Sequence, residues 1–236
     1  MHKLHVITRT SGRPNFFKIC NQSITQQTYK NINHIVVVDD ANTNPERSVQ
    51  VPWHVGNGYI NQYKNITKIN ISWNNISHFE QALNFALDEI PDEDYFCILD
   101  DDDFYTSPNS LQTAMSLVDN KDILFWRVYA AAGIVPDKSH FKKALPYGQI
   151  AMIGWIVKKS FIKNCRFNPM YGGDFDFIQQ ITGGNVLTPN IGWHDDILSA
   201  TNPRQPQGEG SCRDISPNAG MIGFKSRSKG FNYDFM

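Results

Sequence analysis

The stretch YFCILDDDD, residues 95–103, joins five apolar residues directly to four aspartates. A continuous apolar run of this length, rich in β-favouring residues, predicts a strand that is buried on both faces. The strand therefore ends at a concentrated negative charge. Carboxylates a few ångströms apart disfavour one another's ionised form unless a cation lies between them, so the pattern favours a divalent metal ion. An acidic, solvated turn is the alternative interpretation.

Alternation along an extended chain predicts Asp100 and Asp102 on one face and Asp101 and Asp103 on the other. We therefore expect Asp100 and Asp102 to share one metal ion while Asp101 reaches a neighbouring hydroxyl. Oxygen ligands suit Mg²⁺ or Mn²⁺, which take one or two protein carboxylates and complete their shell with water and phosphate oxygens.

Two further buried strands are expected upstream, at residues 4–7 and 34–38. The second is followed by Asp39 and Asp40, so its carboxyl end is acidic as well. Between them, Pro14 is suited to the first turn of a helix. That helix has an apolar face formed by residues spaced three and four apart, namely Phe17, Cys20 and Ile24.

Helices flank the strand at residues 95–99 on both sides in the sequence. Residues 77–90 carry apolar side chains at helical spacing, and Ser77 with Glu80 matches a capping box at the start. After the aspartates, Ser107 followed by proline predicts the beginning of another helix, with Leu111 on its inner face.

The rest of the chain continues this alternation. Strands are expected at residues 123–128, 150–157 and 186–193, and a short helix at 174–181. Strands alternating with amphipathic helices predict an α/β fold with a mostly parallel central sheet and helices on both faces, where ligands bind at the carboxyl ends of the strands. Residues 202–236 lose this periodicity and are expected to form a C-terminal tail or mobile loop.

Composition limits the function classes. A chain of 236 residues, 41% hydrophobic and 19% charged, fits one domain, and its net charge of −1 disfavours nucleic acid as a partner. An apolar run of about 18 residues and a signal peptide are both missing, so we expect a cytoplasmic protein with no transmembrane segment. Four widely spaced cysteines predict neither a zinc site nor a disulfide scaffold.

Three motifs in order resemble one enzyme family. The sequences VITR (6–9), VVVDD (36–40) and ILDDDD (98–103) are similar to the nucleotide-sugar half of the inverting family 2 glycosyltransferases, which have a GT-A fold. The resemblance covers residues 1–201. It implies a single-domain GT-A (nucleotide-diphospho-sugar transferase) domain at 1–201, with the tail at 202–236 outside it.

The family's donor site implies roles for particular residues. By this resemblance Thr8, Arg9 and Asp39 match positions that contact the base and ribose of a nucleoside diphosphate sugar, and Asp101 is a further candidate for the ribose. A solvated loop cation is the alternative for Arg9, and a turn-forming acid is the alternative for Asp39.

Downstream segments match the acceptor side of the same family. The sequence GGDFDF (172–177) resembles the stretch that places the catalytic base at a helix start, which implies Asp174 as the base that activates a glycan, lipid or protein hydroxyl. Gly173 stands where the family more usually has Glu. The alternative for Asp174 is a helix N-cap, and Asp176 is the nearest other carboxylate.

The sequence WHDDILS (193–199) resembles a late strand whose histidine is a further metal ligand in some GT-A enzymes, which implies His194 beside Asp100 and Asp102. Two other functions stay open at this point. A sugar-phosphate nucleotidyltransferase would share the fold and the acidic site, although the glycine-rich loop typical of those enzymes is missing after the first strand. A non-catalytic carbohydrate-binding protein would not need the acidic strand ends.

Overall fold

The computed structural model describes residues 2–10, 14–39, 57–72, 79–130, 133–170 and 172–201. Its strands are β1 (Leu4–Thr10), β2 (Ile32–Asp39), β3 (Ile66–Ile71), β4 (Tyr95–Ile98), β5 (Asp103–Tyr105), β6 (Ile123–Ala130), β7 (Gly133–Val135), β8 (Trp155–Lys158) and β9 (Ile191–Thr201). Its helices are α1 (Pro14–Thr25), α2 (Ala82–Asp88), α3 (Ser110–Leu117), α4 (Lys159–Ile162) and α5 (Gly173–Thr182), with 3-10 turns η2 (Asn57–Gln62) and η4 (Phe79–Gln81).

The described strands form one sheet in the order β3-β2-β1-β4-β8-β6-β9-β5, and β7 pairs with β6. Strands β3, β2, β1 and β4 run parallel to one another, and we call them the parallel half. β8 is antiparallel to both β4 and β6, β9 is parallel to β6, and β5 is antiparallel to β9. We call these strands, with β7, the mixed half.

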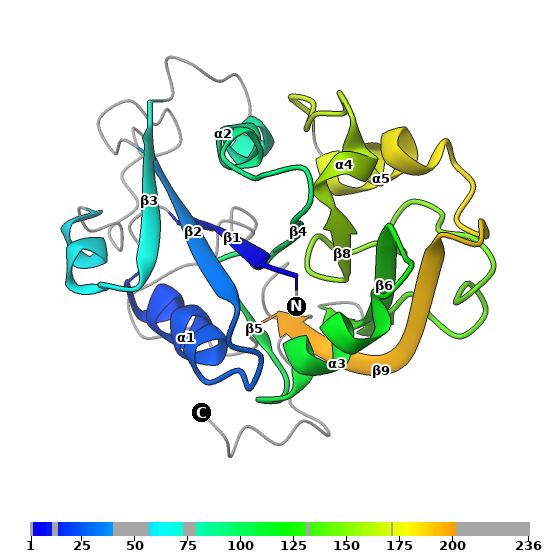
Figure 1. The fold of residues 1–236 in the computed structure, drawn as a ribbon, viewed down its shortest axis with the longest axis horizontal. Helices are drawn as coiled ribbons and strands as arrows, with labels where there is room; N and C mark the ends of the chain where they lie inside the picture. The colour runs from blue at the N-terminus through cyan, green and yellow to red at the C-terminus, as the bar shows by residue number, and fades with distance from the viewer. Residues whose placement is uncertain are drawn as a thin grey trace, which may run out of the picture.

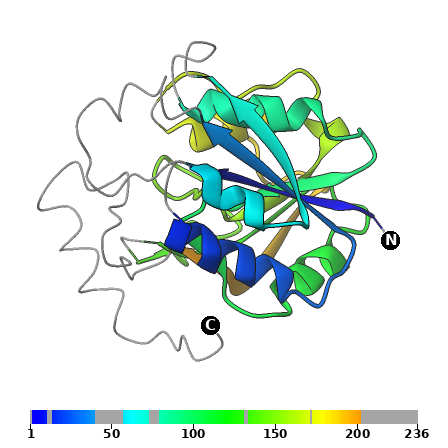
Figure 2. The same cartoon turned by 90° about the vertical axis from the view of Figure 1, so that its left-hand side faces the viewer.

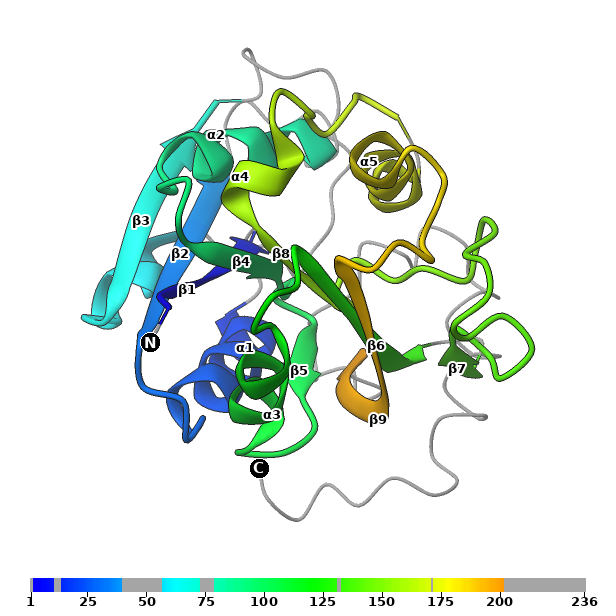
Figure 3. The ribbon, with the colours of Figure 1, turned by 45° about the vertical axis from the view of Figure 1, so that its right-hand side comes forward.

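Helices cover both faces of the sheet, as the sequence predicts. α1 and α3 lie on one side of the sheet, while α2, α4 and α5 lie on the other (Figure 1). Figure 2 shows α1 and α2 on opposite sides of the parallel half, and Figure 3 shows β6 and β9 side by side in the mixed half. The predicted α/β class is confirmed, although a parallel direction throughout holds only in the parallel half.

Aromatic packing fixes the position of α5 on the mixed half. Phe177 of this helix is fully buried and stacks on Phe167 with ring centroids 4.1 Å apart and on Trp155 of β8 at 5.9 Å. Trp155 in turn meets the ring of Phe96 in β4 edge to face. Burial of one such side chain contributes about 1.5–3 kcal/mol, so the first turn of α5 is held at a defined place.

Most sequence-predicted elements of the parallel half are confirmed. β1 and β2 pair in parallel, Pro14 begins α1, and Phe17, Cys20 and Ile24 are buried. All four residues of β4 are buried too. The predicted capping box cannot be followed because Ser77 lies outside the described residues. The helix expected after Ser107 begins later, at Ser110.

Two predictions in the mixed half are wrong in their bounds. The strand expected at residues 150–157 begins only at Trp155, because residues 151–154 form a turn in which the Gly154 amide donates to the Ala151 carbonyl at 2.9 Å. The strand expected at 186–193 begins at Ile191, because the Ile191 amide closes another turn on the Thr188 carbonyl. In the first of these places Met152 and Ile153 are buried from a turn, whereas in the second Val186 is buried and Leu187 is exposed.

Within the described ranges, no helix has the length and apolar composition needed to span a bilayer. Cys20, Cys97 and Cys165 form no disulfide, which agrees with the sequence prediction, and Cys97 is buried in β4. Cys212 and the predicted tail at 202–236 lie outside the described residues.

Candidate active site

The carboxyl ends of β1 and β4 lie next to each other. Ile7 pairs in register with Ile98, and the Leu99 amide continues the ladder by donating to the Ile7 carbonyl at 2.9 Å. Residues 99–101 therefore leave β4 beside residues 8–10, the last residues of β1, which still pair with β2. This edge is where an α/β sheet binds ligands, and two of the quoted motifs meet here.

Arg9 joins two carboxylates at this edge. Its Nε and Nη2 donate to the two carboxylate oxygens of Asp100 at 2.8 and 2.5 Å, and its Nη1 donates to Oε2 of Glu80 at 2.9 Å. All three side chains are at most 13% exposed. Such a bidentate pair is geometrically demanding, so the Arg9 guanidinium is engaged by the protein itself and is not the solvated loop cation of the alternative interpretation.

The Thr8 hydroxyl is bonded to protein groups both as donor and as acceptor. Its side chain is fully buried, and its hydroxyl donates to the Leu99 carbonyl at 2.7 Å and accepts from Nε2 of His34 at 2.9 Å. Burial lowers the pKa of His34 to about 3, so this imidazole is neutral at pH 7. Thr8 thus connects β1 to β2 and β4 beneath the site.

The four aspartates do not alternate as an extended strand would place them. β4 ends at Ile98, and the Asp103 amide donates to the Asp100 carbonyl at 2.9 Å, which closes a turn before β5 begins. Successive side chains in a turn do not alternate between two faces as they do in a strand. The prediction of alternating faces is therefore wrong. Asp101 is 1% exposed and accepts from the Thr10 hydroxyl at 2.7 Å, so the expected contact with a neighbouring hydroxyl is present within the protein.

This turn carries a strong negative field into the protein interior. Asp101, Asp102 and Asp103 are all less than 8% exposed. Burial raises the pKa of the Cys20 thiol well above its usual value, a hydrogen bond to Thr8 partly opposes this, and the charges of Asp101 and Asp103 raise it further. A cation arriving here would lower the free energy of these buried carboxylates.

The predicted ligand set of Asp100, Asp102 and His194 is not assembled. In the part of the chain that the structure describes, no group of three or more His, Cys, Asp or Glu side chains is arranged to hold a metal ion. Arg9 engages both oxygens of Asp100. His194 lies in β9 opposite Trp126, and its Nε2 is 3.2 Å from Oδ2 of Asp196, an ion-pair distance without hydrogen-bond geometry.

Asp174 lies in the first turn of α5 without capping it. The N-cap is Gly172, which has φ of +81°, and Asp174 occupies the second helical position with its Oδ1 accepting from the Phe175 amide at 2.8 Å. The N-cap alternative is therefore wrong. A carboxylate in this position interacts favourably with the positive end of the helix dipole.

Asp176, the other carboxylate near this helix start, is engaged elsewhere. Its Oδ2 accepts from the side-chain amides of Asn168 at 2.9 Å and Gln180 at 2.7 Å. The bond from Asn168 joins α5 to the loop before it, and the bond from Gln180 lies within the helix. Asp176 is therefore a structural residue, and Asp174 remains the better candidate for a base.

Glu80 connects the two sides of the site, which sequence reasoning missed. Besides pairing with Arg9, its side chain packs on Gly173: a Cβ at Gly173 would lie 3.1, 3.3 and 3.4 Å from Cγ, Cβ and Cδ of Glu80. The sequence pattern assigned Glu80 to a capping box, whereas its carboxylate binds Arg9. The lack of a side chain at Gly173 was the available signal, because it leaves room for a neighbour.

The last predicted donor residue is Asp39, which ends β2 and pairs in register with Ile71. Its side chain lies outside the described residues. Its backbone position, two strands from Asp100, agrees with a place at the carboxyl edge of the parallel half.

Comparisons with known proteins agree with this arrangement. The sequence profile of "Glycosyl transferase family 2" matches residues 5–171. No curated protein sequence matches the chain. Among solved structures, TarS 1-349 from S. aureus in complex with UDP-GlcNAc matches with a TM-score of 0.63 and 16% identity, covering 96% of this chain and 65% of that one.

Two further structures show the same fold. TarS 1-349 without a named ligand matches at a TM-score of 0.61 and 16% identity, over 85% of this chain but only 60% of that one. The mannosyltransferase PcManGT from Pyrobaculum calidifontis, in complex with GDP-Man and Mn2+, matches at 0.58 and 11% identity, over 96% of this chain and 73% of that one. The fold is GT-A, and the chain belongs to glycosyl transferase family 2.

Proposed function

We propose that this chain transfers a sugar from a nucleoside diphosphate sugar to an acceptor hydroxyl, with inversion at the anomeric carbon and Asp174 as the base. The observation that carries the proposal is the chain of contacts Asp100–Arg9–Glu80–Gly173, which joins the acidic turn to the helix start of Asp174. A transferase needs its donor-phosphate site and its base at a fixed separation. This network would hold the acidic turn and the helix start of Asp174 at such a separation.

The donor class is supported by the structural neighbours, whose complexes contain UDP, UDP-GlcNAc and GDP-Man. For this chain we propose that Asp39 contacts the nucleoside. We assign Thr8, Arg9 and Asp101 to positioning, because all three side chains are bonded to protein groups. We further propose that residues 1–201 form the transferase domain.

Mn²⁺ or Mg²⁺ is the proposed cofactor, and the chemistry of the acidic turn suits it. The turn is buried and carries the carboxylates of Asp101, Asp102 and Asp103, which are the hard oxygen ligands that such a cation takes. A hard cation of this kind needs just one or two protein carboxylates when phosphate oxygens complete its shell. We propose Asp102 as the first ligand, and His194 as a ligand only if its side chain turns away from Asp196. The bound metal would neutralise charge on the departing diphosphate.

Asp174 performs the proton transfer in this proposal. Its carboxylate accepts the proton of the acceptor hydroxyl, the oxygen forms its new bond to the anomeric carbon, and the bond to the diphosphate breaks with its electron pair on that leaving group. A single displacement of this kind inverts the anomeric carbon. The helix dipole and the Phe175 amide hold one carboxylate oxygen of Asp174, which orients the other.

The test is release of nucleoside diphosphate from UDP-GlcNAc or GDP-Man in the presence of Mn²⁺. We expect Asp174→Asn to lower the rate of transfer by about 10²- to 10⁴-fold, the usual contribution of a positioned base. Its free energy of unfolding should change by no more than about 1 kcal/mol, because Asn still accepts from the Phe175 amide and only the interaction of the charge with the helix end is lost.

Three other outcomes would contradict parts of the proposal. Release of pyrophosphate from a nucleoside triphosphate and a sugar 1-phosphate, with no nucleoside diphosphate released from the nucleotide sugars, would indicate a nucleotidyltransferase, and binding of sugars without turnover would indicate a carbohydrate-binding protein. Metal-dependent nucleotide binding that is unchanged in Asp102→Ala would remove Asp102 from the metal site.

A further inference from the structure

One aromatic side chain near the proposed base is more exposed than any other aromatic side chain in the described residues. Five large apolar side chains are exposed in the described ranges, and Tyr147 has the highest exposed fraction among them, 61%. Its ring centroid is 5.5 Å from that of Phe175, in a T-shaped arrangement. Phe175 directly follows Asp174 in the first turn of α5.

The backbone holds Tyr147 in a rigid position. Residues 146–149 form a turn in which the Gln149 amide donates to the Pro146 carbonyl at 3.0 Å, and Gly148 has the φ of +81° that this turn requires at its third residue. Gln149 anchors the turn, because its side-chain oxygen accepts from the Asp137 amide at 2.8 Å. A turn closed and anchored in this way presents the Tyr147 ring with little loss of entropy on binding.

Tyr147 also lies against the N-cap of α5. A Cβ at Gly172 would lie 2.8 Å from Cε2 and 3.1 Å from the hydroxyl oxygen of Tyr147, so only glycine leaves room for this ring. The φ of +81° at Gly172 would strain a side chain there as well. The lack of space and the positive φ both favour glycine at position 172. That glycine allows the Tyr147 ring to pack against the chain two residues before Asp174.

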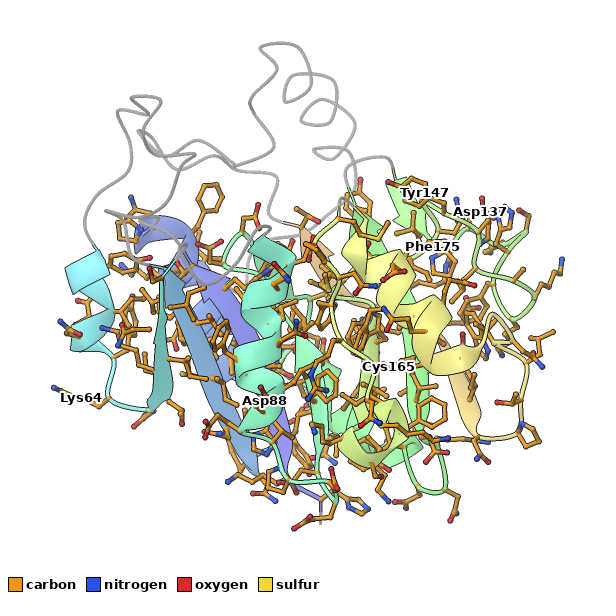
Figure 4. All side chains as sticks on the ribbon, turned by 90° about the horizontal axis from the view of Figure 1, so that it is seen from above. Lys64, Asp88, Asp137, Tyr147, Cys165 and Phe175 are labelled. Carbon is orange, nitrogen blue, oxygen red and sulfur yellow. The ribbon has the colours of Figure 1, made fainter. Side chains whose placement is uncertain are left out.

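The pair lies at the functional edge of the molecule. Figure 4 places Tyr147, Phe175 and Asp137 at one edge and Lys64, which precedes β3, at the opposite edge. Because β3, β2, β1 and β4 are parallel, the edge opposite Lys64 is the one where their carboxyl ends lie. The acidic turn after β4 and the Tyr147 ring therefore open to the same side.

We propose that Tyr147, supported by Phe175, binds a pyranose ring of the acceptor, so that the acceptor is a carbohydrate; this rests on the proposed function. Axial C–H groups of a sugar carry a partial positive charge that matches the negative face of an aromatic ring. The hydroxyls at the edge of the sugar ring match the carboxylate of Asp174. A single aromatic ring beside carboxylates therefore suits a sugar, which is neutral, apolar on the face of its ring and polar at its edge.

Charge and area disfavour other acceptors. Asp174 and Asp176 both lie in the first turn of α5, so an acceptor carrying phosphate would bring like charge next to them. A lipid chain would need a wide apolar surface, whereas the five exposed large apolar side chains of the described residues are spread over separate elements, with Tyr147 and Met170 the two on the segments that lead to α5.

The experiment measures binding of simple probes to the full chain by saturation-transfer NMR, with and without UDP or GDP plus Mn²⁺. The sugar probes are the methyl glycosides of glucose, galactose and mannose, and the comparison probes are glycerol, a serine tripeptide and dodecyl phosphate. We expect at least one methyl glycoside to bind. Tyr147→Ala should weaken its binding about tenfold, and Tyr147→Phe, which keeps the ring, should stay within about twofold of the unmodified protein.

Leu187→Ala is the matched control, because Leu187 is 58% exposed and should leave sugar binding unchanged. The thermal midpoint of each variant verifies folding. Failure of every glycoside to bind, equal binding to Tyr147→Ala, or preference for dodecyl phosphate or the tripeptide would each overturn the inference. Affinity for UDP or GDP is measured separately in all variants. A protein that binds sugars through Tyr147 but releases no nucleoside diphosphate would disprove the proposed function alone.

Discussion

The parallel half and the mixed half hold their sides of the site by different physical means. In the parallel half, buried charges connect strand ends: Arg9 of β1 pairs with Asp100 after β4 and with Glu80 of η4. In the mixed half, neutral hydrogen bonds do this work. The buried Ser199 hydroxyl of β9 accepts from Nε1 of Trp126 at 2.8 Å and donates to the Ile153 carbonyl at 2.6 Å.

This difference matches the chemistry that each half is proposed to perform. A site for a diphosphate and a metal ion needs fixed charges, and a buried ion-paired network keeps carboxylates ionised and oriented. A site for a neutral sugar needs shape and a few polar groups, which turns and aromatic rings supply. The two halves should therefore respond differently to loss of one partner, because an unpaired buried charge costs more than an unpaired buried dipole.

The largest expected effect is in the parallel half. Arg9→Ala leaves the carboxylates of Asp100 and Glu80 buried without the guanidinium, and removal of one partner from a buried ion pair costs about 3–5 kcal/mol. Urea unfolding measures this loss. Arg166→Ala is the matched control, because Arg166 pairs with Asp88 at 2.9 Å but both side chains are more than 40% exposed, and such pairs contribute at most about 1 kcal/mol. Equal losses in both variants would contradict a special role for the Arg9 network.

The second largest loss of stability is expected in the mixed half. Ser199→Ala leaves the Trp126 indole N–H and the Ile153 carbonyl without their partner, and two such buried groups should together cost about 2–3 kcal/mol. Ser116→Ala, whose exposed hydroxyl donates to the Thr113 carbonyl, should change stability by no more than about 0.5 kcal/mol. If Ser199→Ala costs more than Arg9→Ala in the same urea assay, the contrast between the halves is wrong.

The two halves also differ in how far the sequence predicts them. In the parallel half, apolar runs end in charged motifs, so the end of β4 could be placed to within one residue, although β1 continues three residues past its predicted end, to Thr10. In the mixed half, apolar runs pass through turns such as residues 151–154, and periodicity does not distinguish a buried turn from a buried strand. The antiparallel direction of β8 has no local signal either, because it depends on pairing with β4 and β6.

Within the site, the sequence identified residue types better than roles. Asp100, Asp101 and Asp102 were found because charge directly after a buried strand is unusual, and Asp174 was found through the resemblance of GGDFDF to the family. Their contacts could not be predicted, since whether Arg9 binds Asp100 or a ligand depends on the register between β1 and β4. Glu80 and Gly173 were missed as a pair because they are distant in sequence and meet only after α2 and α5 have packed.

A pH effect of intermediate size tests the neutral part of the parallel half. Burial lowers the pKa of His34 in the folded state to about 3. As pH falls below about 6.5, the imidazole therefore takes up a proton in the unfolded state but not in the folded state. The contribution of His34 to stability is fully present above about pH 6.5 and declines below it. Between pH 7 and pH 5 this loss should be about 2 kcal/mol.

His34→Gln provides the comparison, because a glutamine side chain donates to Thr8 without titrating. Urea unfolding at pH 7, 6 and 5 should give a decline in the unmodified protein that is about 2 kcal/mol larger than in the variant. Equal declines would show that His34 takes up a proton inside the fold and that its environment is less apolar than its burial indicates.

The smallest expected effect on stability, with a clear effect on activity, is at the junction of the two halves. Gly173→Ala adds a Cβ that must lie 3.1–3.4 Å from the Glu80 side chain, so Glu80 or the start of α5 has to move by a few tenths of an ångström. The gain in helix propensity of about 1 kcal/mol offsets much of this strain, and net stability should change by less than about 1 kcal/mol. Because the Asp174 carboxylate moves with the helix start, kcat should fall by about threefold to tenfold, while KM for the donor should stay near its normal value.

Gly58→Ala is the control for this last variant. A Cβ at Gly58 would meet no atom within 4 Å, so this substitution has the same effect on the chain without crowding and should leave kcat unchanged. A second variant, Gly173→Ala combined with Glu80→Gln, separates position from charge. Glutamine is as large as glutamate but carries no charge. If kcat is as low in the double variant as in Gly173→Ala alone, crowding of the helix start is the cause. Normal turnover in Gly173→Ala itself would show that Asp174 does not depend on contact with Glu80, and the two halves would then act independently.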